Sequence, residues 1–230
     1  MPRTKRMIPL DFPLHIMVRG NNKYPIFAND LDKIYYLNVL QDLNLEHEID
    51  LYHYCLMNNH LHLLLQAQRP ESFSHFMMRV NLTYFFYFNK KYGYVGHLFQ
   101  NRFKSHIIDN DLYLLNCGKY IELNPVRGGI VARPEEYLFS SFRYYFLGVE
   151  NPLLKPDPVY QALPGSAERR REFYRELVVD NKMIPDEKIG KRRFIGNEAF
   201  IKRMERRFGL PNECKRPGRP RKENRTAPNS

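Results

Sequence analysis

Two runs of strand-forming residues, joined by Asn58–Asn59, constrain the fold of this 230-residue chain more than any other feature. The runs read IDLYHYCLM (residues 49–57) and HLHLLLQAQ (residues 60–68). A pair of asparagines between two such runs is typical of the tight turn of an antiparallel hairpin. We therefore predict a hairpin whose second strand carries two histidines among leucines.

The segments around the hairpin predict an α+β domain. Hydrophobic spacing, helix caps and turn residues indicate the other elements: a strand in 12–22, helices in 29–48, 72–93 and 109–129, and an extended segment in 97–109. Pro125 should stop the last of these helices. The order β-α-β-β-α-β-α favours an antiparallel sheet with helices packed on one face.

The composition changes near residue 150, which suggests further segments after the main domain. We expect the main domain in 1–148, a Pro-rich linker in 149–165, a small helical appendage in 166–210 and a basic tail, disordered on its own, in 211–230. Two short basic helices, in 166–180 and 197–210, would form the appendage, which could bind DNA.

The charge of the chain points to a polyanionic partner. Lys and Arg number 36 against 25 Asp and Glu, so the formal net charge is +11. Nucleic acid is the commonest partner of such a basic surface, although a generic basic protein remains the alternative.

The cysteines and the apolar runs indicate the compartment. Cys55, Cys117 and Cys214 lie far apart without CxxC spacing, which argues against a disulfide framework and fits a reducing cytoplasm. No apolar run approaches the roughly 20 residues that span a bilayer. We expect a cytoplasmic protein without a membrane segment.

His60 and His62 share one face of the predicted strand. Side chains alternate along a strand, so both imidazoles point to one side while Leu61 and Leu63 point to the other. The two imidazoles could converge on one metal ion. The alternative is a pair of partly exposed histidines at a sheet edge.

Tyr120 and Asn124 are four residues apart, one helical turn, and would share a helix face. Two imidazoles and an amide oxygen could hold a divalent ion with open positions, beside a tyrosine oxygen that attacks a phosphodiester. The alternative is that Tyr120 packs with its hydroxyl hydrogen-bonded and Asn124 caps the helix before Pro125.

Three motifs in this order resemble a known family. YCLMNNHLHLLL (54–65), GHLFQNRFKSHIID (96–109) and KYIELNPVRGGIV (119–131) look like those of the REP-associated tyrosine transposases. These belong to the single-tyrosine transposases among the HUH single-strand endonucleases. The resemblance covers roughly residues 10–148 and implies the HUH nuclease fold, a ferredoxin-like variant.

The resemblance implies a role for four residues. His60 and His62 match the histidine pair that binds the metal, Tyr120 matches the nucleophile, and Asn124 falls where the family completes the metal site. The metal would be Mg²⁺ or Mn²⁺.

The chain departs from the family pattern at four positions. Phe99 replaces a commoner Trp, Asn101 a Gly, Gly128 an Ala and Lys119 an Arg. None of these changes removes a proposed catalytic atom.

The implied activity is metal-dependent cleavage and rejoining of single-stranded DNA at palindromic REP-type hairpins, through a 5′-phosphotyrosine and a free 3′-OH. No nucleotide cofactor is expected, and no P-loop signature is present. A catalytically silent DNA-binding regulator of the same hairpins is the alternative. An RNA-binding protein is a third, but it leaves the His–His–Tyr–Asn set unexplained. Whether the protein acts as a monomer or a homodimer stays open.

Several basic residues could contact DNA phosphates, namely Arg19, Arg102, Lys104 and Arg127, although each could equally be a solvated surface charge. The tail KRPGRPRK (215–222) resembles an AT-hook, in which Arg219 would enter a narrow minor groove. The alternative for the tail is a nonspecific electrostatic arm.

Overall fold

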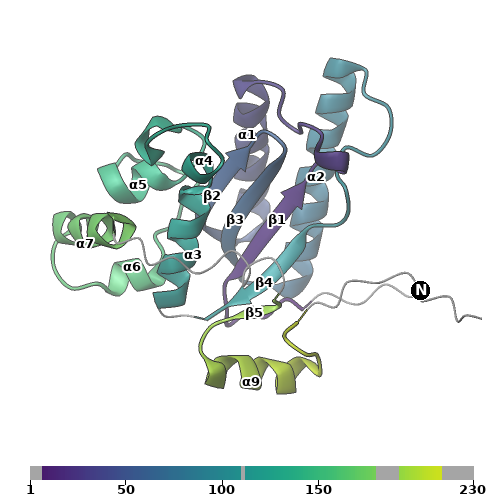
Figure 1. The fold of residues 1–230 in the computed structure, drawn as a ribbon. Coiled ribbons are helices and arrows are strands. Elements are labelled where there is room, and N and C mark those ends of the chain that lie inside the picture. Colours follow the sequence, from purple (N-terminus) through teal and green to yellow (C-terminus); the bar gives the residue numbers. More distant parts are fainter. Residues whose placement is uncertain (1–6, 110–111, 180–191, 214–230) are drawn as a thin grey trace, which may run out of the picture.

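The computed structural model describes residues 7–109, 112–179 and 192–213 (Figure 1). Its centre is a five-stranded sheet with the strand order β2-β3-β1-β4-β5. The strands are β1 (Leu14–Arg19), β2 (Ile49–Met57), β3 (His60–Ala67), β4 (Lys104–Ile108) and β5 (Phe194–Ile195). The predicted hairpin is confirmed, with β2 and β3 antiparallel around Asn58–Asn59.

The helices begin and end where local signals place them. Asn29 caps the first helix in a capping box with Asp32, and Gly93 ends the second in the left-handed conformation. The α-helices are α1 (Asp30–His47), α2 (Pro70–Tyr92), α3 (Leu112–Glu122), α4 (Asn124–Arg127), α5 (Phe142–Leu147), α6 (Pro158–Ala162), α7 (Ala167–Val179) and α9 (Glu198–Phe208). Two 3₁₀ turns are η1 (Asn21–Lys23) and η2 (Pro134–Glu136).

The sheet is mixed, which corrects the expectation of an entirely antiparallel sheet. β1 pairs antiparallel with both β3 and β4, as expected, but β5 pairs with β4 in parallel. β5 has only two residues, too few for an alternating pattern to reveal a strand in the sequence. The predicted α+β class is confirmed.

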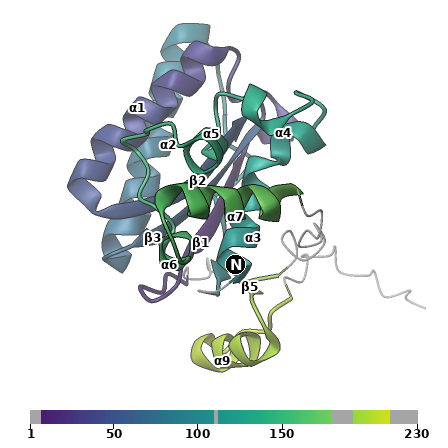
Figure 2. The same ribbon diagram turned by 90° about the vertical axis from the view of Figure 1, so that its left-hand side faces the viewer.

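Helices cover both faces of the sheet, rather than the one face that we expected (Figures 1 and 2). Leu63 and Leu65 of β3 face α1 and α2, where they lie beside Leu40 and Phe76. The histidines of β3 point to the other face, which α3 covers. The reason is that β2 and β3 are buried along almost their whole length, so each needs a covering layer on either side.

The chain beyond residue 148 contains the helices that the sequence predicted in 166–180 and 197–210, as α7 and α9. A second cluster of buried side chains joins α3 to α5, α6 and α7 through Leu115, Tyr145, Tyr160 and Tyr174. Residues 149–165, expected as a linker, include α6 and the buried Asp157. The division of the chain into domains stays a prediction, and residues 214–230 lie outside the described residues.

Within 7–109, 112–179 and 192–213, no helix combines the length and the apolar character needed to traverse a lipid bilayer.

Candidate active site

The sheet face beneath α3 carries histidines from four neighbouring strands. Cross-strand partners point to the same side, so the register places on this face His15 of β1, His53 of β2, His60 and His62 of β3 and His106 of β4. Most of these side chains are buried. The face is therefore rich in groups that can bind a cation or relay a proton.

His60 and His62 lie side by side, with 5.1 Å between their ring centres. Nδ1 of His60 is 2.6 Å from Oδ1 of Asn59. Because an amide oxygen only accepts hydrogen bonds, Nδ1 of His60 carries the hydrogen and its Nε2 keeps a lone pair. The Asn59 contact thus leaves on Nε2 of His60 the lone pair that coordination of a cation would require.

His62 is oriented by a second histidine. Its Nδ1 lies 2.9 Å from Nε2 of His15, and the two rings are stacked. If His62 donates this bond, its own Nε2 is left with a lone pair for a metal, the arrangement that supports most metal-binding histidines. The other ring nitrogen of His15, Nδ1, is buried and has no hydrogen-bond partner.

Both proposed ligands are neutral near pH 7. Burial, together with the nearby Arg19 charge, lowers the pKa of His60 to about 4. Burial, followed by the neighbouring histidines, lowers the pKa of His62 well below its usual value. A neutral imidazole has the lone pair that coordination requires.

Tyr120 of α3 lies against His62 and its partner His15. Its ring centre is 6.0 Å from that of His62 and 6.1 Å from that of His15. Burial raises the pKa of Tyr120, and the Arg127 guanidinium, whose carbon is 4.8 Å from the ring centre, opposes the increase. The tertiary structure therefore brings the phenol of Tyr120 together with the imidazoles of His62 and His15, which are far from it in the sequence.

Asn124 caps the end of α3. Its Nδ2 donates to the backbone oxygens of Tyr120 at 2.9 Å and Ile121 at 3.1 Å. This is the capping role that we considered as the alternative, but it uses only the amide nitrogen. The amide oxygen remains the atom with which Asn124 could coordinate a cation.

The α4 turn that begins at Asn124 lies over the end of the hairpin that carries His60. A Cβ built on Gly128 would be 3.0 Å from the terminal methyl of Met57, and Met57 pairs with His60 across the hairpin. Gly128, where the family more often has Ala, therefore lies close to the end of β2, the strand that pairs with the histidine-bearing β3.

Two imidazoles and one amide oxygen would be a mixed nitrogen and oxygen donor set that leaves positions open on a divalent cation. Across the described ranges, no group of three or more His, Cys, Asp or Glu side chains could hold a metal ion. A cation at this site would instead use two imidazoles and an amide oxygen, which suit Mg²⁺ or Mn²⁺ and leave room for a phosphate oxygen.

The predicted DNA-binding residues lie at different distances from the site. Arg19 pairs with His60 across β1 and β3, Lys104 is exposed on the same sheet face, and Arg127 covers Tyr120. Arg102 lines a cavity of about 640 Å³ between α2 and the 96–103 loop. Arg219 lies outside the described residues.

The sequence pattern did not single out His15, His53 or His106. His15 stands at an alternate position in the buried strand LHIMVR, which is an unusual place for a polar residue. That signal was available, but only the register of β1 with β3 and β4 puts His15 beside His62 and His106.

Comparisons with known proteins identify the family to which this chain is similar. The model of a family described as IS200-like transposases matches residues 10–124. A protein of Haemophilus influenzae, assigned as a REP-associated tyrosine transposase, is 30% identical over an alignment of 139 residues that covers 52% of this chain and 77% of the relative.

A solved structure has the same fold. It is a REP-associated tyrosine transposase bound to a REP hairpin, and it superposes with a TM-score of 0.54 over 73% of this chain and 96% of its own. Its sequence identity to this chain is 18%, so the similarity concerns the fold alone.

Proposed function

Because this chain belongs to the IS200-like transposase family, among the REP-associated tyrosine transposases, we propose that it is an enzyme that cleaves and rejoins single strands of DNA. The observation that carries the proposal is the position of Tyr120, 6.0 Å between ring centres from His62 and beside His15. His60, His62 and Asn124 would hold Mg²⁺ or Mn²⁺. The bound cation would polarise the scissile phosphodiester.

The residues of the chain bind, orient and activate the reacting groups. Arg19 and Lys104, on the histidine face, would hold DNA phosphates near the site. Arg127 lies against the Tyr120 ring and would favour the phenolate over the phenol. His15 would hold His62 in the tautomer that coordinates.

The reaction is a transesterification, in which phosphorus exchanges its bond to one oxygen for a bond to another. The Tyr120 oxygen forms a bond to phosphorus while the bond from phosphorus to the 3′ oxygen breaks. The phenolic proton ends, through solvent, on the departing 3′ oxygen. The products are a 5′-phosphotyrosine and a free 3′-OH, and the reverse reaction with another 3′-OH joins strands without ATP.

The substrate that we propose is a palindromic DNA hairpin with single-stranded flanks. The solved structure with this fold is of a relative bound to a REP hairpin, and the net charge of +11 here suits a DNA backbone. Such a role would place the protein in the cytoplasm, at the nucleoid. A DNA contact by Arg102 or by Arg219 stays a prediction.

A denaturing gel tests the function. Wild-type protein, incubated with a single-stranded hairpin and Mn²⁺, is expected to form a covalent protein–DNA adduct, and Tyr120→Phe is expected to form none. Tyr113→Phe makes the same change on the same helix and is expected to form the adduct normally. Absence of an adduct with wild type, or an equal amount with Tyr120→Phe, would refute the assignment.

The second candidate is a silent regulator that binds the same hairpins without cutting them. The intact set of Tyr120, His60, His62 and Asn124 argues against it. Hairpin binding by wild type, together with no adduct under any divalent cation, would favour this candidate.

A further inference from the structure

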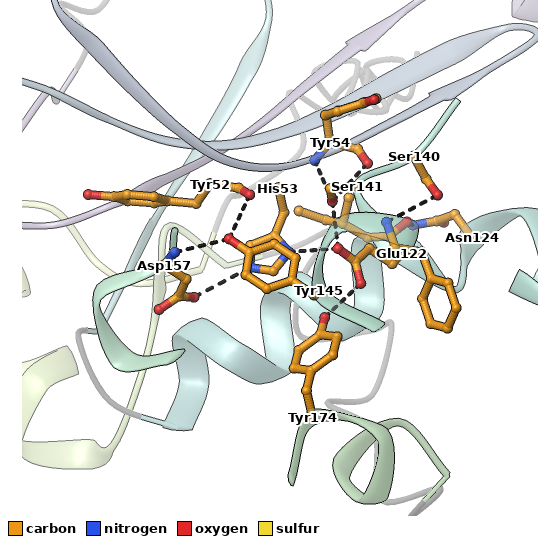
Figure 3. Close-up of polar contacts among 12 residues, drawn as sticks. Tyr52, His53, Tyr54, Glu122, Asn124, Ser140, Ser141, Tyr145, Asp157 and Tyr174 are labelled. Carbon is orange, nitrogen blue, oxygen red and sulfur yellow. Dashed lines mark hydrogen bonds and ion pairs between the residues drawn. The ribbon is translucent and has the colours of Figure 1, made fainter. Parts of the chain in front are cut away.

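Glu122, at the end of the helix that carries Tyr120, is fully buried and accepts three hydrogen bonds (Figure 3). Its Oε1 is 2.8 Å from Nδ1 of His53 and 2.5 Å from Oγ of Ser141, and its Oε2 is 2.7 Å from the hydroxyl of Tyr174. One carboxylate of α3 is thus tied to β2, to the residue before α5 and to α7.

His53 extends the same network. Its Nε2 lies 3.4 Å from Oδ2 of Asp157, and its ring stacks on Tyr145 with 4.2 Å between centres. The Tyr145 hydroxyl donates to the backbone oxygen of Tyr52 at 2.9 Å and accepts from the Asp157 backbone at 3.0 Å. His53 and both carboxylates are buried, so the group forms one closed network of charged and hydroxyl groups.

Lys119 provides a second polar connection between α3 and α7. It directly precedes Tyr120, is almost wholly buried, and donates from Nζ to the backbone oxygen of Leu177. Around it, Leu115 of α3 packs against Tyr174 of α7 in the second buried cluster. α3 is therefore held between the sheet on one side and α5, α6 and α7 on the other (Figure 1).

A network of buried charges is a costly way to stabilise a helix contact. Apolar side chains of the same volume would often hold two helices as well or better, because buried charges lose their hydration. Directional hydrogen bonds to both oxygens of one carboxylate, however, allow little rotation or sliding of α3. Since Glu122 is two residues from Tyr120 and two from Asn124, a shift at Glu122 moves both.

We propose that Glu122, His53 and Tyr174 are positioning residues, which fix the rotation of α3 so that the Tyr120 oxygen is aimed at a phosphate held beside the paired histidines. This inference rests on the proposed function and deepens it. Ser141, Asp157 and Tyr174, the outer partners of the network, follow residues 10–124, the part of the chain that the family model matches. The helices after the matched segment thus act on the chemistry through α3.

The first test separates catalysis from binding. Tyr174→Phe removes one bond to Glu122, and Ser141→Ala removes another. Each is expected to slow single-turnover adduct formation about ten-fold or more, because a displacement of about 1 Å at a reacting atom has such effects. The Kd for the hairpin should stay within about two-fold, since the DNA-binding side chains keep their places.

A matched control is Tyr160→Phe. Tyr160 belongs to the same buried cluster as Tyr174, but it does not bond to Glu122. This variant is expected to cleave and bind as the wild type does. Glu122→Gln, which can still accept two of the bonds, should retain more activity than Glu122→Ala.

The second test does not depend on cleavage. Amide hydrogen exchange of α3 is expected to be several-fold faster in Tyr174→Phe than in wild type and unchanged in Tyr160→Phe, while β3 stays protected in both. If the wild type forms no adduct, the nuclease assignment fails and the exchange of α3 alone decides the positioning role.

Two results would overturn the proposal. One is unchanged exchange of α3 in Tyr174→Phe and Ser141→Ala. The other is a pair of findings for both variants: adduct forms at the wild-type rate, and amide exchange rises evenly over all helices and strands. Those findings would show that the network stabilises the fold without positioning Tyr120.

Discussion

At the scale of single residues, the site depends on which ring nitrogens of the histidines carry hydrogen. Asn59 accepts from Nδ1 of His60, and His15 meets Nδ1 of His62. If His62 donates to His15, both contacts leave Nε2 as the atom with which each histidine would coordinate a cation. The proposed metal site therefore depends on these two partners as well as on His60 and His62.

Replacing His15 should weaken cation binding. In His15→Leu, Nδ1 of His62 loses its partner and the ring can turn, so the affinity for Mn²⁺ is expected to fall about ten-fold or more. Electron paramagnetic resonance of free Mn²⁺ during a titration measures this affinity. His97→Leu, a change at an exposed histidine of the 96–103 loop, is the control and should bind Mn²⁺ as the wild type does. Equal affinities in all three proteins would contradict the orienting role of His15.

Arg127 should govern the pH at which Tyr120 reacts. Burial raises the pKa of Tyr120, and Arg127 opposes the increase. Removing the guanidinium should therefore raise the pKa of Tyr120 further. In Arg127→Met, the pH–rate profile of adduct formation is expected to shift to higher pH, whereas Arg127→Lys should shift it less. An unshifted profile with a weaker hairpin affinity would mean that Arg127 acts only on DNA.

At the scale of elements, α3 approaches the sheet closely because residue 118 is glycine. A Cβ built on Gly118 would lie 2.5 Å from Cε1 of His53, and Glu122 and Asp157 hold that ring in place. Alanine usually favours a helix over glycine by roughly 1 kcal/mol, but here the added methyl would have to push α3 away from β2.

Gly118→Ala is therefore expected to destabilise the protein, by about 1–3 kcal/mol in urea unfolding, and to slow adduct formation. A double-mutant cycle with His53→Ala identifies the cause, because the added methyl meets no ring in that background and its effect should largely vanish. An equal loss of stability from Gly118→Ala in both backgrounds would show that His53 is not the obstacle.

At the scale of the whole molecule, the charge on His53 links five elements of the fold. Burial on its own would lower the pKa of His53, but Glu122 of α3 and Asp157 before α6 raise it to about 9. Tyr145 of α5 and Tyr174 of α7 complete its surroundings, and burial holds their pKa values above 10. Folded protein thus keeps a proton on His53 at pH values where the unfolded chain, with a pKa near 6.5, has lost it.

Because of this proton on His53, the free energy of unfolding is expected to fall as the pH rises. The stabilisation is fully present below pH 6.5 and is lost as the pH rises from 6.5 to about 9, by on the order of 3 kcal/mol. Urea unfolding at pH 6.5, 7.5 and 8.5 measures the loss, and an NMR titration of the His53 ring should have its midpoint near pH 9. A midpoint below pH 7, or a free energy of unfolding that does not change between pH 6.5 and 8.5, would contradict the raised pKa of His53.

The other histidines on this sheet face change stability with pH in the opposite direction; they are His15, His60, His62 and His106. Burial lowers the pKa of each, so they stay neutral in the folded protein while the unfolded chain takes up protons below pH 6.5. Their contribution to stability is lost as the pH falls through 6.5. The most stable state is therefore expected close to pH 6.5–7.

Local patterns in the sequence determined much of this protein. The alternation of side chains in 60–68 is enough to predict a strand with both histidines on one side, and capping residues and glycines place the ends of α1 and α2. The four-residue spacing of Tyr120 and Asn124 predicted that the two residues lie about one turn apart, and Asn124 does donate to the Tyr120 backbone oxygen. These signals survive because each depends on neighbours within a few residues.

Only the tertiary structure decided which distant groups meet. His15 and His62 are 47 residues apart and His53 and Asp157 are 104 apart, and no periodicity within a segment encodes either pair. The packing of whole elements likewise decides that α1 and α2 cover one face of the sheet and α3 the other. It also decides that β5 pairs with β4 in parallel. That packing is set by the requirement to cover two apolar faces and to pair every buried charge, which no single segment can meet alone.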